Sequence, residues 1–516
     1  MASNVALFQV LTCVSVRNLY VCKLLYRGAT PILGRAVSLR HPRTIISKDA
    51  LEELLDVEKL KYCYECGICT ASCPMTELLG KDYNPRRLLE KIFLNPDDIL
   101  ASDELWLCAW CYRCHKRCPQ ALKLPEIFLF VRKMAKEHGY TQPFGEALQK
   151  IVENIPFPLV TTLVCFHPER AGLDKGSVLE KIEKLRDELP KGKKRRMHVK
   201  SAEGKVAVIG SGPAGLTVAY ELSKKGYDVT IFESLAEAGG MLRKCIPEYR
   251  LPKQVLTKEL EAIKDFGVKI KTNVTVGKDL SFGDIWKEEY KAIFIGTGAH
   301  KSQKLEIEGG DLKGVVHALD FLWNVNRGET MEIGRNVVVI GGGNVALDTA
   351  RTIFRLGGNE VAVLYRRSRE EMPANPWEVK ETEDEGVRIE FLVAPKKILG
   401  QKGKISAIEC VRMQLGEMDE TGRRKPIPIE SSEFTRETDM VILAIGEAPD
   451  LEFLPKEIEL NEDGTVWVNP ITMETNLKGV FAGGDAVTGP ATVIEAIQAG
   501  KRAAESIESY LKSSGG

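Results

Sequence analysis

The sequence predicts an α/β protein in which the α/β region is preceded by a cysteine-rich, mainly α-helical module. Two β-α-β units, each with a glycine-rich turn after its first strand, predict the α/β region. Two runs of four closely spaced cysteines predict the separate N-terminal module. At about 150 residues per domain, a chain of 516 residues has room for three or four domains, so both regions fit in one protein.

Composition excludes several classes of protein. Lys plus Arg and Asp plus Glu number 72 each, and balanced charge gives no general attraction to nucleic acid. No apolar run reaches the roughly 18 residues of a membrane-spanning helix. Eight of the 13 cysteines lie in two short runs, which favours metal ligation in a reducing compartment over a disulfide framework. We therefore expect a cytoplasmic chain with no membrane span and no nucleic-acid partner.

The two cysteine runs both read C-x2-C-x2-C-x3-C-P, the spacing of bacterial ferredoxins, in which the fourth cysteine ligates the other cluster. That rule predicts one [4Fe–4S] cluster on Cys63, Cys66, Cys69 and Cys118, and a second on Cys73, Cys108, Cys111 and Cys114. Zinc is the alternative, but zinc sites usually combine two cysteine pairs across a longer gap. Because the runs start 45 residues apart, ligation of each cluster by a single run is a second arrangement that the spacing allows.

The first glycine-rich turn, GSGPAG, lies between a strand expected at 205–209 and a helix. Its glycines allow a tight turn and a close approach of a pyrophosphate to the N-terminus of that helix. Glu233 follows the second strand, where a carboxylate would bind ribose hydroxyls. The residues predicted to form this site are Gly210, Gly212, Pro213, Ala214, Gly215 and Glu233.

The second glycine-rich turn, GGGNVA, opens another β-α-β unit, with an alanine in place of the third glycine. After its second strand the chain continues with two arginines, where a carboxylate would have favoured NAD. Arginine accommodates the 2′-phosphate of NADP, although two solvated surface arginines would give the same pattern. The predicted NADP(H) site consists of Gly341, Gly343, Asn344, Val345, Ala346, Arg366 and Arg367.

Two dinucleotide sites in one chain suggest a donor and acceptor pair, with FAD at the first site and NADP(H) at the second. Segments 293–299 and 441–450 are typical of the short strand–glycine links between such domains. In the GGDA motif, Asp485 could bind the ribityl chain of the flavin, and the helix that follows could direct its N-terminal dipole at the flavin ring.

The α/β region resembles the glutamate synthase small subunit family, which includes the flavoprotein subunit of NADPH-dependent ferredoxin:NADP oxidoreductases. The motifs GSGPAGLTVAYELSKKGYDVTIFE, GGMLRKCIPEYRLP, GGGNVALDTAR, LYRRSREEMPA and GGDAVTGPATVIEAIQAGK carry the resemblance. It implies further cofactor-binding residues, namely Gly240, Met241, Arg250, Gly296, Thr297, Gly298, Gly446, Gly484, Asp485 and Thr492.

The cysteine-rich module resembles the two-cluster ferredoxin subunit of heterodisulfide reductases. The family resemblance of the α/β region extends weakly to 153–176, a stretch that carries cluster cysteines in that family. Here only Cys165 remains, and Glu169 stands at the next ligand position. We infer that the iron–sulfur arrangement of the flavoprotein family is lost and that the two cysteine runs replace it.

These motifs divide the chain into six segments. The first 48 residues are basic and contain no acidic residue, as in a transit peptide or in an extension that packs on the protein or a partner; we favour the extension. The expected segments are a basic N-terminal extension (1–48), a two-[4Fe–4S] ferredoxin-like domain (49–140), a connector (141–203), a first FAD-binding segment (204–325), the NAD(P)H-binding domain (326–450) and a second FAD-binding segment (451–516), which completes the domain begun by the first.

Together, the motifs and the resemblance predict an NAD(P)H-dependent iron–sulfur flavoprotein oxidoreductase subunit. It would move electrons between NADPH and a protein partner through FAD and two [4Fe–4S] clusters, with no catalytic acid or base of its own. The expected partner is a ferredoxin, a heterodisulfide-reductase-like complex or a glutamate synthase large subunit. Two alternatives are the electron-supplying small subunit of a glutamate synthase and an electron-transfer scaffold without its own turnover, against which the intact glycine turns argue.

Overall fold

The computed structural model describes residues 13–16, 19–22, 59, 63–188, 204–419 and 422–514. The chain divides into an N-terminal unit, 1–44, and a second unit that contains the remaining residues. In the first unit, β1 (Cys13–Val16) pairs antiparallel with β2 (Leu19–Cys22). The rest of the expected N-terminal extension and the basic end of the expected connector, 189–203, lie outside the described residues.

Residues 63–188 form a module of short helices, named here the helical module. Its α-helices are α3 (Cys63–Cys66), α4 (Ile68–Ala71), α5 (Pro74–Leu79), α6 (Pro85–Leu94), α7 (Pro96–Leu100), α8 (Arg113–Lys116), α9 (Leu124–Glu137), α10 (Gln142–Asn154), α11 (Pro158–Thr161) and α12 (Lys175–Glu188). Proline occupies the first or second position of six of them, α5, α6, α7, α9, α10 and α11, where its fixed φ favours a helix start. The predicted mainly helical character is confirmed.

The segment that we expected to be a connector contributes three helices to the helical module. One face of α10 buries Ala147, Leu148 and Ile151, and α12 buries Val178 and Ile182. These side chains belong to the same hydrophobic core as the helices of the cysteine-rich segment. The apolar spacing along α10 therefore makes this stretch an element of the module and not a linker.

The first dinucleotide domain contains a parallel five-stranded sheet in the order β18-β6-β3-β4-β5. The strands are β3 (Lys205–Ile209), β4 (Asp228–Phe232), β5 (Lys269–Lys271), β6 (Tyr290–Ile295) and β18 (Val480–Ala482). The helices are α14 (Pro213–Lys224), α15 (Met241–Lys244), α16 (Lys253–Asp265), α17 (Phe282–Lys287), α21 (Asp485–Thr488) and α22 (Val493–Ser514). Since β18 comes from the C-terminal end of the chain, this domain is split in sequence, as predicted.

The second dinucleotide domain contains a parallel sheet in the order β11-β10-β9-β16-β8. Its strands are β8 (Val315–His317), β9 (Asn336–Ile340), β10 (Glu360–Tyr365), β11 (Arg388–Phe391) and β16 (Met440–Leu443), and its helices are α18 (Ala318–Asn326), α19 (Asn344–Arg355) and α20 (Pro376–Asp384). An antiparallel sheet that the sequence did not predict is inserted before β16; it consists of β12 (Val393–Gln401), β13 (Lys404–Met418), β14 (Arg424–Pro428) and β15 (Phe434–Glu437).

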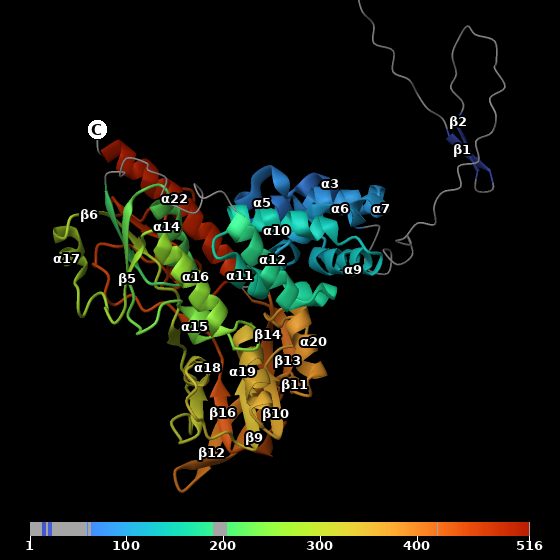
Figure 1. Cartoon of the computed structure of the whole chain (residues 1–516). Helices are drawn as coiled ribbons and strands as arrows, with labels where there is room; N and C mark the ends of the chain where they lie inside the picture. The colour runs from blue at the N-terminus through green and yellow to red at the C-terminus, as the bar shows by residue number, and fades with distance from the viewer. Residues whose placement is uncertain are drawn as a thin grey trace, which may run out of the picture. The chain divides into compact units, whose positions relative to one another are not determined.

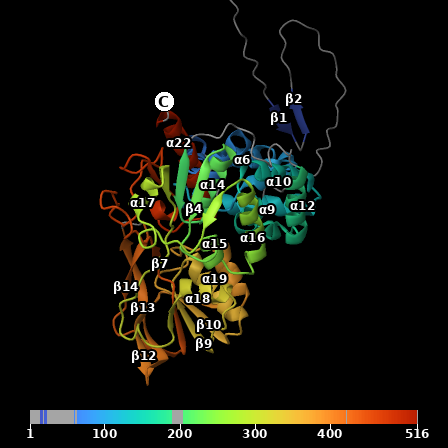
Figure 2. The same cartoon turned by 60° about the vertical axis from the view of Figure 1, so that its left-hand side comes forward.

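The chain passes between the two dinucleotide domains along a short ribbon. β7 (Lys301–Ser302) leaves the first domain and β17 (Glu447–Ala448) returns to it, and the two pair antiparallel. Of the segments predicted to be interdomain links, 293–299 leads into β7 and 441–450 contains β17. Figures 1 and 2 show the second dinucleotide domain, in yellow and orange, below the first.

Helix α22 connects the helical module to the first dinucleotide domain. Figure 1 shows α22, in red, beside α14 and α5. A Cβ at Gly500 would lie 2.6 Å from the carbonyl oxygen of Ala214, so only glycine allows α22 to pack this closely on α14. On its other side, Arg502 pairs with Glu77 of α5 at 2.6 Å, and Lys501 donates to the Leu78 carbonyl. One hydrophobic core runs through the helical module and the first domain.

No helix among the described residues combines the length and the apolar character needed to cross a bilayer. The predicted α/β architecture, with two parallel sheets and a helical module before them, is confirmed.

Candidate cofactor-binding sites

A cavity opens at the carboxyl edge of the first parallel sheet, where α14 and α22 begin. Of the residues predicted to bind cofactor, ten line it: Gly212, Pro213, Ala214, Met241, Gly296, Thr297, Gly298, Gly484, Asp485 and Thr492. Six more line it that the sequence did not single out: Leu242, His300, Gly483, Ala491, Val493 and Ala496. Gly483 lies in the GGDA motif, and Val493 and Ala496 lie in the first turn of α22, directly after Thr492, so their positions near predicted residues were an available signal. His300 had none.

In the first turn, one glycine allows close packing of the backbone and another leaves room for a ligand. Gly210 has φ of 97°, and a Cβ there would lie 2.5 Å from the carbonyl oxygen of Gly296. Gly212 has an ordinary φ of −70°, and a Cβ there would meet only that same oxygen, at 4.0 Å. Any side chain at Gly212 would therefore project into the cavity, where a pyrophosphate would approach the N-terminus of α14.

Two polar groups of the cavity fit a flavin with a hydroxylated chain. The Thr297 hydroxyl is buried and has no hydrogen-bond partner among the described residues. Burial, together with the negative charges of Glu495 and Glu447, raises the pKa of Asp485 to about 7. The backbone amide of Ala491 donates to the Asp485 carboxylate and has the opposite, smaller effect on this pKa. An orphaned hydroxyl and a buried carboxyl both require polar ligand atoms, which ribityl hydroxyls would supply.

Glu233 lies at the end of β4, as predicted, but it already has protein partners. Its carboxylate accepts hydrogen bonds from the backbone amide of Ser211 at 3.0 Å and from that of Leu235 at 2.9 Å, and also from the Ser211 hydroxyl. It is 5% exposed. The first role of Glu233 is therefore to fix the glycine turn against the loop that follows β4. Gly240 and Gly215 likewise pack against this turn and do not line the cavity.

The second glycine turn repeats the geometry of the first. A Cβ at Gly341 would lie 2.1 Å from the carbonyl oxygen of Ala444, just as Gly210 abuts Gly296 in the first domain. Gly343, with φ of −87°, has open space where its Cβ would be. Val345 follows in the first turn of α19, Ala346 is buried there, and the side-chain oxygen of Asn344 accepts from the backbone of Asn375. The turn thus leaves room for a second dinucleotide.

The two arginines predicted to bind a 2′-phosphate occupy different environments. Arg366 is exposed at the end of β10. Arg367 is buried; its Nη2 pairs with Asp419 at 2.6 Å, and its Nε donates to the Arg424 carbonyl. The Arg367 guanidinium is thereby committed to the connection between β13 and β14. Binding of the 2′-phosphate by these two residues stays a prediction, and Arg366 is the exposed one of the two.

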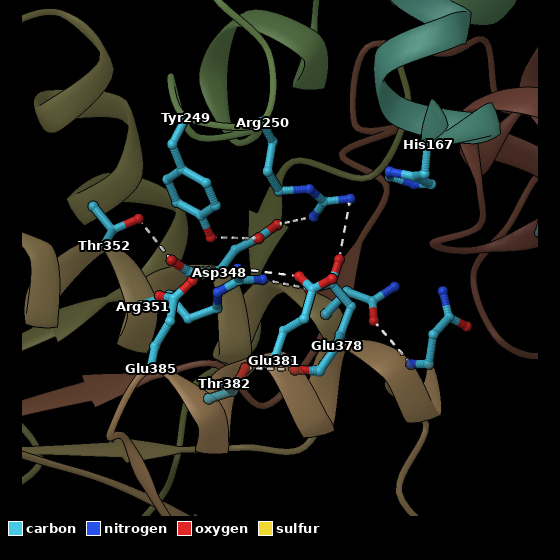
Figure 3. Close-up of polar contacts among 12 residues, drawn as sticks. His167, Tyr249, Arg250, Asp348, Arg351, Thr352, Glu378, Glu381, Thr382 and Glu385 are labelled. Carbon is cyan, nitrogen blue, oxygen red and sulfur yellow. Dashed lines mark hydrogen bonds and ion pairs between the residues drawn. The ribbon is translucent and has the colours of Figure 1, made fainter. Parts of the chain in front are cut away.

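Arg250 is not among the residues that line this cavity, and its role in cofactor binding stays a prediction. Figure 3 shows its guanidinium between two carboxylates of the second domain: Asp348 at 2.5 Å and Glu378 at 3.3 Å. Tyr249 also donates to Asp348, and Arg351 pairs with Glu378 at 2.8 Å. Because Arg250 precedes α16 of the first domain, this buried network locks the two dinucleotide domains together.

The helical module joins the same junction. Arg170 pairs with Glu381 of α20 at 3.1 Å and lies over the Trp377 ring. Trp377 stacks with Trp110 of the second cysteine run, with ring centroids 6.4 Å apart. The loop of one cysteine run therefore contacts the nucleotide domain directly.

The eight predicted ligand cysteines form two groups that mix the two runs. Burial raises the pKa of the Cys63 thiol, and the neighbours that raise it further are Cys69, Cys118 and Cys66. Burial likewise raises the pKa of Cys114, and the thiols that raise it further are Cys108, Cys111, Cys73 and Cys69. Thiols of the two runs therefore influence one another, and crossed ligation stays a prediction.

The two cysteine runs share one backbone feature, a left-handed residue after the second cysteine. The residue after the second cysteine, Gly67 in the first run and Tyr112 in the second, adopts a left-handed conformation with φ of 63° and 58°. Each of these residues caps the short helix that carries the third cysteine. The repeat in sequence is thus a repeat in structure.

The remaining cysteines of the second unit are buried and separate: Cys165, Cys245 and Cys410. Burial raises the pKa of Cys165 to about 12, so this thiol stays protonated. Glu169, at the next position of the family's ligand pattern, lies 3.5 Å from the Lys175 ammonium.

We expect Gly212→Ala and Gly343→Ala to have reciprocal effects. Both backbones suit alanine, so each methyl group should act only by occupying cofactor space. Gly212→Ala should be purified with little flavin, whereas Gly343→Ala should retain flavin and bind NADPH about tenfold more weakly, a change of ~1.4 kcal/mol. Flavin absorbance and nucleotide titration measure both, and flavin loss in both variants would contradict the separation of the two sites.

We expect Arg250→Met to destabilise the protein by about 3–5 kcal/mol, because Asp348 and Glu378 would be left buried without this cation. Arg355→Met is the matched control. Arg355 pairs with Glu385 in the same network at 2.6 Å but is 45% exposed, so its loss should cost less than about 1 kcal/mol. Urea unfolding of both variants provides the comparison, and equal effects would contradict the buried character of the Arg250 pairs.

Comparison with known proteins assigns the family. Residues 204–500 match the pyridine nucleotide-disulphide oxidoreductase family, and residues 59–122 match the 4Fe-4S dicluster domain. The fold is similar to that of Mycobacterium tuberculosis FprA in complex with NADPH, with a TM-score of 0.52 and 21% identity over 60% of this chain and 85% of that one.

Curated relatives are more similar in sequence. The NADP(+)-dependent formate dehydrogenase subunit beta of Moorella thermoacetica is 49% identical over 60% of this chain and 44% of its own. The NADPH-Fe(3+) oxidoreductase subunit beta of Geobacter sulfurreducens is 37% identical over 77% and 63%. The glutamate synthase [NADPH] small chain of Azospirillum brasilense is 39% identical over 60% and 66%. The chain spans 44–66% of the length of these three relatives. With its two dinucleotide folds and the match over 204–500, the chain belongs to the pyridine nucleotide-disulphide oxidoreductase family.

Proposed function

We propose that this chain is an oxidoreductase subunit that transfers electrons between NADPH and a protein partner through FAD and two [4Fe–4S] clusters. The observation that carries the proposal is the position of Glu495 in the first turn of α22. One of its carboxylate oxygens pairs with Arg113, between two ligand cysteines, and the other accepts from Thr492, which lines the flavin cavity. A single side chain thus contacts both the cluster loop and the cavity.

The residues of each site have separate tasks in this scheme. The second glycine turn and Arg366 hold NADPH, and the first turn, Thr297 and Asp485 hold FAD. Hydride acceptance and single-electron release are the chemistry that the bound flavin supplies. The protein orients the two nucleotides through the Arg250 network, and it needs no catalytic acid or base.

The two cysteine groups differ in exposure, which supports an order for the relay. In the group that contains Cys108 and Cys114, both of these residues are buried, and Arg113 of the same loop contacts α22. In the other group Cys66 is exposed, and Ile68 beside it is 39% exposed. We therefore assign the buried group, Cys73, Cys108, Cys111 and Cys114, to the inner cluster next to the flavin, and the exposed group to the outer cluster at the partner.

The partner is proposed to be a larger redox assembly in the cytoplasm. The similar proteins named above are subunits of a formate dehydrogenase, an iron(III) oxidoreductase and a glutamate synthase. Each of the three names describes one subunit or chain of a larger enzyme and contains NADP or NADPH. The cysteine runs, absent from the flavoprotein match at 204–500, would provide the connection to another subunit here.

We expect the anaerobically purified chain to contain about eight iron and eight labile sulfide, the content of two [4Fe–4S] clusters. Iron and sulfide analysis with EPR of the reduced protein measures this directly. Stoichiometric zinc without sulfide would refute the two-cluster proposal while leaving the flavin site unaffected.

We expect Arg366→Ala to raise the KM for NADPH by about one to two decades, because a charge-assisted hydrogen bond to a phosphate contributes roughly 1.5–3 kcal/mol. The kcat and the kinetics with NADH should change little, since the 2′-phosphate lies far from the transferred hydride.

Arg367→Ala is the companion variant. It should lower stability, because Asp419 loses its buried partner, and it should leave the preference for NADPH intact. Steady-state kinetics with both nucleotides decide the matter: a wild type that prefers NADH, or a preference that depends on Arg367 alone, would contradict the assignment.

A further inference from the structure

A buried cation without a carboxylate lies beside the inner cysteine group. Arg132 of α9 is 3% exposed. Its Nε donates to the Leu105 carbonyl at 2.9 Å and its Nη2 to the Cys108 carbonyl at 2.8 Å. Its guanidinium also lies 5.7 Å from the centre of the Trp106 ring. Within the residues that the structure describes, no Asp or Glu forms an ion pair with it.

An uncompensated buried guanidinium is unusual because arginine stays charged and its transfer out of water is costly. The other buried arginines among the described residues have carboxylate partners: Arg351 with Glu378 and Arg367 with Asp419. Arg132 departs from that pattern at a place where four thiolate ligands gather. Its compensating negative charge is therefore expected from the iron–sulfur cluster that those thiolates would bind.

A second polar side chain is buried near the same cysteine. Tyr83, between α5 and α6, is 1% exposed, and it belongs to the same core as Cys108. Burial raises the pKa of its phenol, and Cys108 is the thiol that raises it most. Tyr83 thus lies near Cys108, and Arg132 contacts Cys108 at its carbonyl oxygen. The two side chains come from different elements and converge on one ligand residue.

The outer cysteine group has different surroundings. The charged side chain that influences Cys63 is that of Arg86, which is half-exposed, and Cys66 itself is exposed. Water can therefore screen the charge of an outer cluster, whereas an inner cluster depends on the protein.

The chemistry of the group explains what these two residues would do. A [4Fe–4S] cube with four thiolate ligands is an anion, and it gains one more negative charge when it is reduced. Burial opposes that gain, whereas a nearby cation and a hydrogen bond to a ligand sulfur favour it. Without such compensation, a buried inner cluster would be harder to reduce than an exposed outer one.

We propose that Arg132 and Tyr83 are positioning residues that act through Cys108 to raise the reduction potential of the inner cluster, so that it can accept an electron from the flavin. The proposal rests on the two-cluster function given above. The step transfers one electron from reduced flavin to the oxidised cluster. Tyr83 keeps its proton throughout, and no further reactant is required.

The test is an EPR-monitored redox titration of the full chain with both clusters loaded. Tyr83→Phe removes only the hydroxyl group, and Arg132→Met removes the charge at similar volume. Each should lower the midpoint potential of one cluster and leave the other unchanged, and Arg132→Lys should recover most of the wild-type potential. Iron and sulfide content establishes that both clusters are present in every variant.

Matched controls separate electrostatics from general damage. Lys133→Met removes an exposed charge from the neighbouring position on α9, and Tyr220→Phe removes a hydroxyl group in the first dinucleotide domain. Both should leave the two potentials at their wild-type values.

Unchanged potentials in Tyr83→Phe and Arg132→Met, with clusters loaded, would overturn the proposal. If Arg132→Met fails to assemble its clusters, Tyr83→Phe decides the question alone. A wild-type chain that holds no iron and sulfide would instead refute the two-cluster function, so the two failures are distinguishable.

Discussion

The carboxylate of Glu495 is the interaction on which the arrangement of sites depends. It pairs with Arg113 of the helical module and accepts from Thr492 at the flavin cavity. Further along α22, the pair between Arg502 and Glu77 holds α5 against the same helix. Because α22 packs on α14 through Gly500, the cysteine loops and the first glycine turn are fixed to one rigid element. In the proposed function, electron transfer between the flavin and a cluster would depend on their separation, and this helix would keep that separation constant.

The sequence predicted those features of the sites that neighbouring residues encode. Glycine turns and cysteine spacing are local, so the two glycine turns and the cysteine-rich module could be predicted before any contact was known. The ion pairs of Arg250 and Arg367 were not predicted, because their partners, Asp348 and Asp419, lie 98 and 52 residues away. Arg132 gave no signal at all, since one arginine on an amphipathic helix normally faces solvent. Contacts of this range arise from packing, which residue spacing does not encode.

The second cysteine run shows how a duplicated motif acquires a specialised environment. Gly67 takes the left-handed conformation freely, but Tyr112 takes it at a cost of roughly 1–2 kcal/mol. Tyr112 is almost fully buried and packs edge-on against Trp110. Burial of an aromatic side chain offsets the backbone strain. The second run thereby gains contacts to Trp377 and the nucleotide domain, while the first run keeps the simpler glycine and stays near solvent.

The ribbon of β7 and β17 bears on how such proteins are assembled in evolution. Because these strands pair, the two points at which the chain leaves and re-enters the first domain are neighbours. A domain whose ends adjoin can be inserted, exchanged or removed as one piece without moving the flanking strands apart. The second dinucleotide domain could therefore be exchanged as one unit. Recombination at this ribbon would be a route by which the first dinucleotide domain acquires a new electron donor.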